Sequence, residues 1–561
     1  MRISKLLLGL GLASVPAATP VSAFGQATIP APETVTPKTL QPPVEKSEAT
    51  VAIPQAEALT PPPGADSIFM TPTHIIIENA FSEVAKRSDT LARSAEGRRL
   101  SLAQIYHLAS EIEAIHARQG FVFARAVVPP QRLVDQGTLR ILVVDGFIEN
   151  IDTSRLPGPI RAAVATRLES LRNRSQLKVD QIEPQLLIAG EVAGASLRST
   201  LARGNQPGGV SLIVEGTWHP LRVTLRQDNA LDRSLGDATS TLQFSTNSLF
   251  GLGETLYGYA ATSNPLRPFA ANTSVRVLGA GFSIAPGNGR LSLNPEFTFS
   301  RTLPRVPANV PRSEGDLLRY AFRAGYLLTV TRARRVALDL SLETLDQRTT
   351  AIDFSTDLAR DHYAVTRLGV SASNAGQRAS WNVSVQLGQG LGGLGGTGDA
   401  PPTRQKATAN FSKVTGQAHA AIALGPRLSI AATALGQSSF GHALLRAEQF
   451  QLEGNEAVSA YIGGVTVVDE GVTARIEAKG RIALTLLPLA PYAFVAAGYG
   501  RIVSPTALEV GHLSAAAIGA GVRTSILKGH AELGAEFAYG KASAAAVGSR
   551  QRLNLVASIR L

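Results

Sequence analysis

The feature that most constrains this chain is an alternation of apolar and polar side chains. It runs from residue 218 to the C-terminus without a segment of helical periodicity. Between residues 336 and 343, for example, each Val or Leu is followed by Ala, Asp, Ser or Glu. A period of two predicts β-strands that each have one apolar face. Alternation alone fits either a soluble all-β domain or a membrane barrel.

Charges on the polar faces favour the barrel. Arg222, Asp339 and Glu343 lie on these faces, and the packed interior of a β-sandwich does not accept unpaired charges. A membrane barrel turns its apolar faces to lipid and its charged faces to a wet lumen. At roughly 20 residues per strand and connection, about 16 strands fit into residues 218–561. We therefore predict an all-β transmembrane barrel.

The N-terminus predicts export from the cytoplasm. Arg2 and Lys5 precede an apolar run over residues 6–13, and small residues suitable for cleavage follow at 21–23. This pattern is typical of a secretory signal peptide, here residues 1–23, and the apolar run is too short to span a bilayer. The lack of cysteine in the sequence agrees with an oxidising compartment. We expect an exported bacterial protein.

The net charge of +11 does not come from a basic patch. Lys and Arg are scattered along the chain, so nucleic acid is not expected as a partner. Arginines that line an aqueous pore would give the same total charge.

Two small α+β units are predicted before the barrel, at residues 67–147 and 148–217. The first contains a strand, an amphipathic helix that begins at a capping box of Ser101 and Gln104, and two more strands. The second contains a strand, two helices and two strands around a Gly-Pro-rich turn. Two consecutive units of similar size indicate a repeated domain.

Residues 24–66 are rich in proline, which removes backbone donors and fixes φ. They predict an extended tether. The alternative is a short helix around residues 45–57, which would contain Pro54.

No motif in the sequence supports an enzyme. Residues 390–395 match GxGxxG, but the Gly-Pro-rich stretch that follows cannot start the helix that dinucleotide binding requires. His107 and Glu111 lie one turn apart on the predicted helix, without further metal ligands nearby in the pattern. We find no GxSxG, HExxH or P-loop motif. We therefore expect no catalytic residues, no metal and no cofactor.

One stretch before the barrel resembles a known signature. The sequence from Gly120 to Gln131, followed by residues 137–151, is similar to the first POTRA domain of the hemolysin secretion, filamentous-hemagglutinin-transporter family of two-partner secretion. A second similarity is residues 247–256, which resemble a turn early in that family's barrel. The signature residues are Gly120, Phe121, Pro129, Gln131, Gly137, Leu139 and Gly146.

The resemblance implies a 16-stranded barrel in the bacterial outer membrane, preceded by two periplasmic POTRA domains. It implies that the POTRA pair captures an unfolded exoprotein by adding a strand to a sheet edge, and that the barrel exports it without nucleotide. The implied partners are the secreted exoprotein, outer-membrane lipid and the barrel-assembly machinery, with the transporter itself a monomer. The alternatives are an assembly factor for outer-membrane proteins, which usually has three or more POTRA units, and a passive porin.

The resemblance also implies a loop that folds into the barrel and a strand that faces it. In the family, an arginine of the loop pairs with an aspartate of the strand. The matching loop residues are Phe450, Leu452, Glu453, Gly454, Val458, Ser459 and Tyr461, and the matching strand residues are Phe494, Ala496 and Gly498.

Both members of that ion pair are missing here, since Ser459-Ala460 replaces Arg-Gly and Ala496 replaces the aspartate. Loss of one partner would leave an unpaired buried charge at a cost of about 3–5 kcal/mol, and loss of both avoids it. We therefore predict a rebuilt loop anchor, with Glu453 bound to an arginine of the lumen as the hypothesis. Two further departures are the proline-broken region where the family often has a helix that plugs the pore, and Leu561 where outer-membrane barrels often end in an aromatic residue.

Overall fold

The computed structural model describes residues 31–42, 50–52, 61–307, 309–392, 400–454, 457–464, 466–482, 487–507, 509–543 and 548–561. The predicted signal peptide and the second half of the GxGxxG motif, residues 393–395, lie outside these residues.

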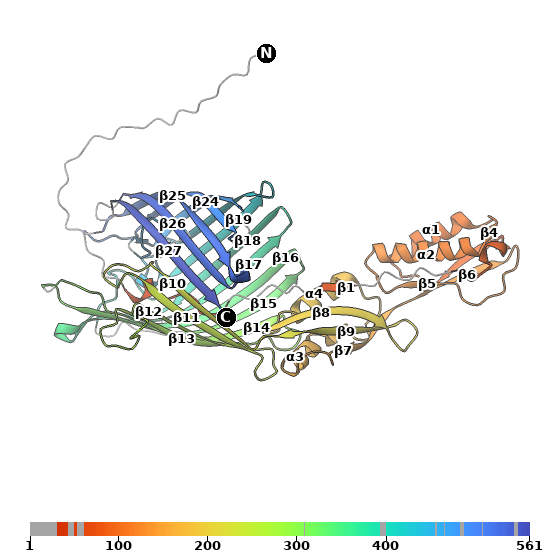
Figure 1. Cartoon of the computed structure of the whole chain (residues 1–561), viewed down its shortest axis with the longest axis horizontal. Helices are drawn as coiled ribbons and strands as arrows, with labels where there is room; N and C mark the ends of the chain where they lie inside the picture. The colour runs from red at the N-terminus through yellow and green to blue at the C-terminus, as the bar shows by residue number, and fades with distance from the viewer. Residues whose placement is uncertain are drawn as a thin grey trace, which may run out of the picture.

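Sixteen antiparallel strands form a closed barrel, each hydrogen-bonded to the next, and the last strand pairs with the first (Figure 1). The predicted 16-stranded barrel is therefore confirmed. The strands are β10 (Leu221–Asp228), β11 (Thr239–Asn247), β12 (Thr255–Thr262), β13 (Val275–Ser283), β14 (Leu291–Thr302), β15 (Ser313–Val330), β16 (Arg334–Ala351), β17 (Thr356–Ala375), β18 (Ala379–Leu391), β19 (Ser412–Ala423), β20 (Leu428–Ser438), β23 (Glu470–Gly480), β24 (Leu489–Arg501), β25 (His512–Ile526), β26 (Ala531–Ala542) and β27 (Ser549–Arg560).

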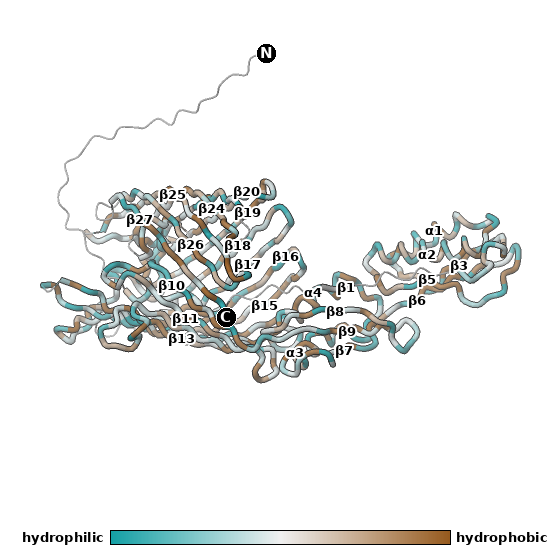
Figure 2. The backbone as a smooth tube through the Cα atoms, viewed as in Figure 1, coloured by the Kyte–Doolittle hydropathy of each residue, from teal (hydrophilic) through white to brown (hydrophobic). Residues whose placement is uncertain are grey.

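The alternation seen in the sequence places apolar side chains outside the barrel. On β16, Leu338, Leu340 and Leu342 are 37%, 53% and 46% exposed, whereas Ser341 and Glu343 are 6% and 8% exposed. Apolar residues recur along the outer wall of the other strands as well (Figure 2). Such a surface is stable only against hydrocarbon, which is the prediction made from the period of two.

The first α+β unit lies farthest from the barrel (Figure 1). Its main sheet has the order β3-β6-β5, and two helices pack on it around one apolar core. The predicted capping box is present, because Ser101 and Gln104 each bond the other's backbone N–H. The elements are η2 (Ala65–Ser67), β2 (Phe69–Met70), β3 (His74–Glu78), α1 (Ala85–Ala95), β4 (Leu100–Ser101), α2 (Leu102–Arg118), β5 (Arg125–Val127) and β6 (Thr138–Val144).

The second unit lies between the first unit and the barrel (Figure 1). Its sheet has the order β1-β8-β9-β7, with two helices over a second apolar core. The elements are β7 (Phe147–Asp152), α3 (Gly158–Leu168), η3 (Glu169–Leu171), α4 (Val179–Ala189), β8 (Ala195–Arg203) and β9 (Gly209–Trp218). No helix within the described ranges has both the length and the apolar character needed to cross a membrane.

Ion pairs and apolar contacts hold the second unit against the barrel rim. Glu183 pairs with Arg332 at 2.9 Å, and Glu191 pairs with Arg335. Beside these pairs, a small apolar cluster joins α4 to β15. On α3, Arg167 is 2% exposed and donates to Ile188 O at 2.8 Å.

The N-terminal region contributes two short segments, one inside the barrel and one on the second unit. Residues 31–42 include η1 (Pro32–Thr34) and contact the inner wall of the barrel. β1 (Thr50–Ala52) pairs in parallel with Arg198–Thr200 of β8 and extends the sheet of the second unit. The alternative of a helix around residues 45–57 is therefore wrong at its centre, because backbone hydrogen bonds to β8 hold residues 50–52 extended.

A charge on the outer wall is expected to destabilise the barrel. Leu340→Arg places a cation in the middle of β16 facing hydrocarbon, and a loss of about 2–4 kcal/mol of unfolding free energy is expected. Urea titration of protein refolded into lipid vesicles measures it. The control is Leu266→Arg, because Leu266 lies outside the strands and is 92% exposed. Equal losses of unfolding free energy from the two variants would contradict a lipid-facing wall at β16.

Candidate functional site: the lumen and its inward loop

The connection between β20 and β23 folds into the barrel. It carries η6 (Arg446–Glu448), β21 (Phe450–Gln451) and β22 (Val467–Val468). Val458 and Tyr461 of this loop, which are 0% and 2% exposed, pack in one cluster with Phe494 and Ala496 of β24. At Gly498, an added Cβ would lie 3.5 Å from Leu452, so the loop also runs close to the strand there.

The loop is anchored through Ser459, the residue that stands where the family has arginine. Its hydroxyl donates to Glu536 Oε1 at 2.5 Å and accepts from Arg475 at 2.9 Å. Its backbone carbonyl accepts from Asn554 at 3.0 Å. A small polar residue of the loop is thereby bound by groups from three barrel strands.

The ion pair of this anchor lies entirely in the barrel wall. Arg475 of β23 donates to Glu536 of β26 at 2.6 Å, and their side chains are 3% and 9% exposed. The Tyr492 hydroxyl also donates to Glu536, at 2.9 Å. Arg475 is the direct cross-strand partner of Ala496, and its guanidinium lies 3.6 Å from the centre of the Phe494 ring. The charge therefore sits one strand away from the position where the family has its aspartate.

The sequence pattern does not single out Arg475, Glu536 or Asn554. Each lies on the polar face of its strand, which the alternation does show. Their meeting depends on the stagger between strands that are not neighbours, and on the small residues that lie between them, such as Ala517. A single sequence determines neither the stagger between the strands nor which small residues will lie between these side chains.

The hypothesis that Glu453 binds an arginine of the lumen is wrong. Glu453 is 4% exposed, and neither carboxylate oxygen has a hydrogen-bond partner among the described residues. Burial raises the pKa of Glu453 to about 8, and the neighbouring Thr466 only partly offsets this. Ser459 supplies the anchor instead, and Glu453 is held in a pocket that favours its neutral form.

A second anchor holds the start of the loop. Arg367 donates to Glu448 at 2.8 Å, Lys413 lies 2.7 Å from the same carboxylate, and the Tyr363 hydroxyl donates to it at 3.0 Å. Burial alone would raise the pKa of Glu448, but the two cations override it and lower the pKa to about 2. A third anchor is Asp469, whose carboxylate accepts from Arg404 at 2.7 Å.

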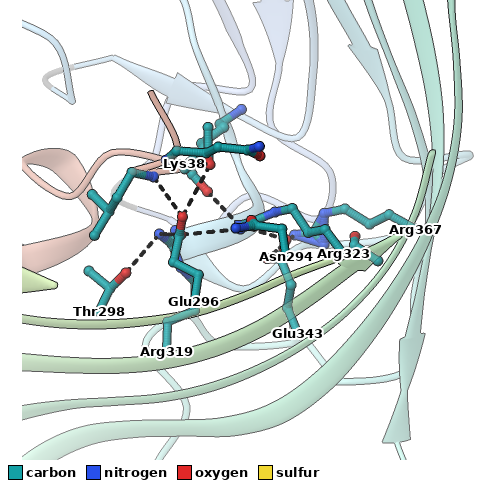
Figure 3. Close-up of polar contacts among 12 residues, drawn as sticks. Lys38, Asn294, Glu296, Thr298, Arg319, Arg323, Glu343 and Arg367 are labelled. Atoms are coloured by element: carbon teal, nitrogen blue, oxygen red, sulfur yellow. Dashed lines mark hydrogen bonds and ion pairs between the residues drawn. The ribbon is translucent and has the colours of Figure 1, made fainter. Parts of the chain in front are cut away.

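On the wall formed by β14 and β15, charged side chains hold residues 37–40 of the N-terminal segment (Figure 3). Arg319 donates to the Pro37 carbonyl at 2.8 Å. Glu296 accepts from the backbone N–H of Leu40 at 2.8 Å. The lumen is thus occupied by two segments of the chain itself, one from the N-terminus and one from the inward loop.

The signature residues of the first α+β unit have structural positions. Gly120 has φ +93 directly after α2, a conformation that favours glycine. At Gly146 an added Cβ would overlap the Phe123 carbonyl. The Gln131 side chain bonds both backbone groups of Arg140, and thus extends the sheet at β6.

The remaining signature residues are placed as follows. Phe121 and Leu139 are 2% and 0% exposed in the core. Pro129 lies just after β5, and at Gly137 an added Cβ would lie 2.8 Å from the Val134 carbonyl. Within the described ranges, no group of three or more His, Cys, Asp or Glu residues is placed to hold a metal.

These features define a class of protein: a closed β-barrel with an apolar outer belt, a charged lumen, an in-folded loop and α+β units at the barrel's mouth. A model of the haemolysin secretion/activation protein family ShlB/FhaC/HecB matches residues 212–524, and a model of the ShlB-type POTRA domain matches residues 70–146. The chain therefore belongs to the haemolysin secretion/activation protein family. This assigns it to the outer membrane, with the POTRA region in the periplasm.

Solved structures share the fold over nearly the whole chain. CdiB from Escherichia coli is 17% identical with a TM-score of 0.69, over 95% of this chain and 94% of that one. CdiB from Acinetobacter baumannii is 13% identical with a TM-score of 0.62, over 88% and 90%. Among curated relatives, the heme/hemopexin transporter protein HuxB of Haemophilus influenzae is 24% identical over 147 residues, which is 26% of each chain. The match spans about a quarter of that relative's length.

Removal of the wall cation is expected to destabilise the barrel strongly. Arg475→Met leaves Glu536 buried without its partner, and a loss of about 3–5 kcal/mol is expected. Ser459→Ala keeps the ion pair and loses hydrogen bonds of the loop, so a smaller loss of about 1–3 kcal/mol is expected. Urea unfolding in detergent micelles measures both. The matched control is Arg348→Met, which removes an arginine of β16 that is 46% exposed; a loss as large as that from Arg475→Met would contradict the anchor.

The inward loop is expected to lose stability as the pH rises. The folded pKa of Glu453, about 8, lies above the ordinary value of 4.5. Protonation of Glu453 therefore stabilises the folded state fully below pH 4.5, and this stabilisation is lost as the pH approaches 8. The change is on the order of 4 kcal/mol. Unfolding free energy measured across this range should fall for the parent protein and stay flatter for Glu453→Gln. The control Glu532→Gln, at an exposed carboxylate, should keep the parent slope; a parallel slope in Glu453→Gln would contradict this prediction.

Proposed function

We propose that this protein exports a partner exoprotein across the bacterial outer membrane. The POTRA units at residues 67–147 and 148–217 capture the unfolded exoprotein, and the barrel at residues 218–561 is the conduit. Residues 1–23 are a signal peptide, and residues 24–66 link it to the POTRA units. Export uses no nucleotide, and the protein has no enzymatic activity. The family match to residues 212–524 supports this function.

The observation that carries the proposal is strand addition at β8. Thr50, Val51 and Ala52 pair in register with Arg198–Thr200, so the edge of the second sheet accepts an extended segment through backbone hydrogen bonds. Backbone pairing of this kind does not require a particular side-chain sequence. An unfolded exoprotein is such an extended segment.

The lumen gives the captured chain a polar route. Outer surfaces of the strands are apolar, whereas the inner surfaces carry Arg, Glu and Asn side chains that hydrogen-bond to backbone groups. A chain that moves through the lumen keeps its polar groups out of the hydrocarbon. We also propose outer-membrane lipid and the barrel-assembly machinery as partners, and a monomeric transporter.

The competing functions differ in what is lost without the protein. An assembly factor would leave several outer-membrane barrels misassembled, and a passive porin would leave both secretion and assembly intact. The family match favours export over both.

Deletion of the gene is expected to remove one or a few large proteins from the culture medium while leaving the other outer-membrane barrels unchanged. Mass spectrometry of the medium and of the outer-membrane fraction measures this, and reintroduction of the full chain provides the control. An unchanged medium, or a general loss of barrels from the membrane, would contradict the proposal.

A further inference from the structure

Residues 37–40 are bound to the lumen wall mainly through their backbone. Arg319 donates to the Pro37 carbonyl at 2.8 Å, and Arg323 donates to the Lys38 carbonyl at 3.1 Å. The Leu40 N–H donates to Glu296 at 2.8 Å. A fourth bond runs from the Gln243 side chain to the Leu40 carbonyl at 3.2 Å. These groups are present in every polypeptide, so most of this recognition does not depend on sequence.

The binding groups on the wall also hold one another in place. Glu296 lies 3.2 Å from Arg319 and 3.2 Å from Arg323, and Arg319 donates to Thr298 at 3.1 Å. Arg323 also lies 3.5 Å from Glu343 (Figure 3). These contacts join wall residues to one another and do not involve residues 37–40, so they brace the wall independently of that segment. A preorganised site binds its ligand at a lower entropic cost.

Among residues 37–40, only the side chain of Leu40 is enclosed. Leu40 is 2% exposed and lies against Gly279, where an added Cβ would overlap the Leu40 side chain. The side chains of Lys38 and Thr39 are exposed, and the Thr39 hydroxyl donates to Glu296 at 3.2 Å. The wall therefore encloses one apolar side chain, and among the other side chains of residues 37–40 only that of Thr39 forms a hydrogen bond to the wall within the described structure.

The site is continuous with the mouth of the barrel. A cavity of about 350 Å³ is lined by Pro42 at the end of the segment, by Glu191 beside β8 and by Arg335 of the barrel. The cavity therefore lies between the start of β8 in the second unit and the end of the segment that is bound to the lumen wall.

We propose that the wall of Glu296, Arg319 and Arg323 is a binding site for an extended polypeptide backbone with one apolar side chain. In the described state residues 37–40 occupy it, and the exoprotein takes their place as it passes through the lumen. This inference rests on the proposed function for the identity of the passing chain, whereas the site itself rests on the contacts above.

Peptide binding to purified full-length protein that lacks only residues 31–42 tests the site. The probes are fluorescent peptides: one with the sequence of residues 31–42, one that keeps residues 31–36 and Leu40 but scrambles the other positions, and one methylated on the Leu40 amide nitrogen. Residues 31–36 are kept because the Glu33 side chain contacts Gln347 and Arg446 outside the proposed site. The first two are expected to bind within about threefold of each other, and the methylated probe about tenfold more weakly, because it cannot donate to Glu296.

The protein variants provide the second arm. Arg319→Gln combined with Arg323→Gln is expected to weaken both unmethylated probes by about tenfold or more. The matched control is Arg523→Gln on β25. Arg523 is a lumenal arginine that pairs with Glu477, and within the described residues it makes no hydrogen bond to residues 31–42. It should leave binding unchanged. If the double variant does not fold, the methylated probe still tests the site on the parent protein.

Two results would overturn the inference: a scrambled probe that does not bind, which would mean a site specific for this chain's own sequence, or equal binding of the methylated and unmethylated probes. Neither result involves the exoprotein. A failure of the proposed function would instead appear as an unchanged culture medium after gene deletion, so the two failures are distinguishable.

Discussion

The rest of the structure depends on the closure of the hydrogen-bond ladder between the first and last barrel strands. β27 pairs with β10, for example Ile559 with Leu225, and no strand edge is left in the hydrocarbon. Unpaired backbone groups have no partners there, so an open sheet would not be stable in the membrane. Closure also creates the lumen, and charged side chains are tolerated on its wall because they face water and one another. Those charges then hold the inward loop and the N-terminal segment.

The loop anchor shows how a buried ion pair can change position between relatives. A buried charge must keep its partner, so both members change together. Here the cation is Arg475, directly across from Ala496, the anion is Glu536, and the loop contributes only Ser459. Glu448 and Asp469 fix the loop at two other points. Contacts from several barrel strands thus hold the loop at three points.

Local sequence patterns predicted the architecture correctly where the periodicity of apolar residues or a helix-capping box determines the structure. The two-residue alternation, together with the charges on the polar faces, predicted the barrel and its lipid face, and Ser101 with Gln104 predicted the start of α2. The site was predicted only in part. The approach of Val458 to Phe494 followed from motif resemblance, whereas Glu453 was assigned the wrong role. Side chains from nonadjacent strands meet according to the stagger of the whole barrel, which a single sequence does not contain.

The central claim is that an extended polypeptide crosses the membrane inside the lumen. Photo-crosslinking in exporting cells tests it most directly, with a photoreactive amino acid placed either at Thr298, which is 0% exposed on the inner wall, or at Leu340, which faces outward on β16. We expect adducts with the exoprotein at position 298 and none at position 340. Export that continues with adducts at position 340 alone, or with none at position 298, would contradict a lumenal route.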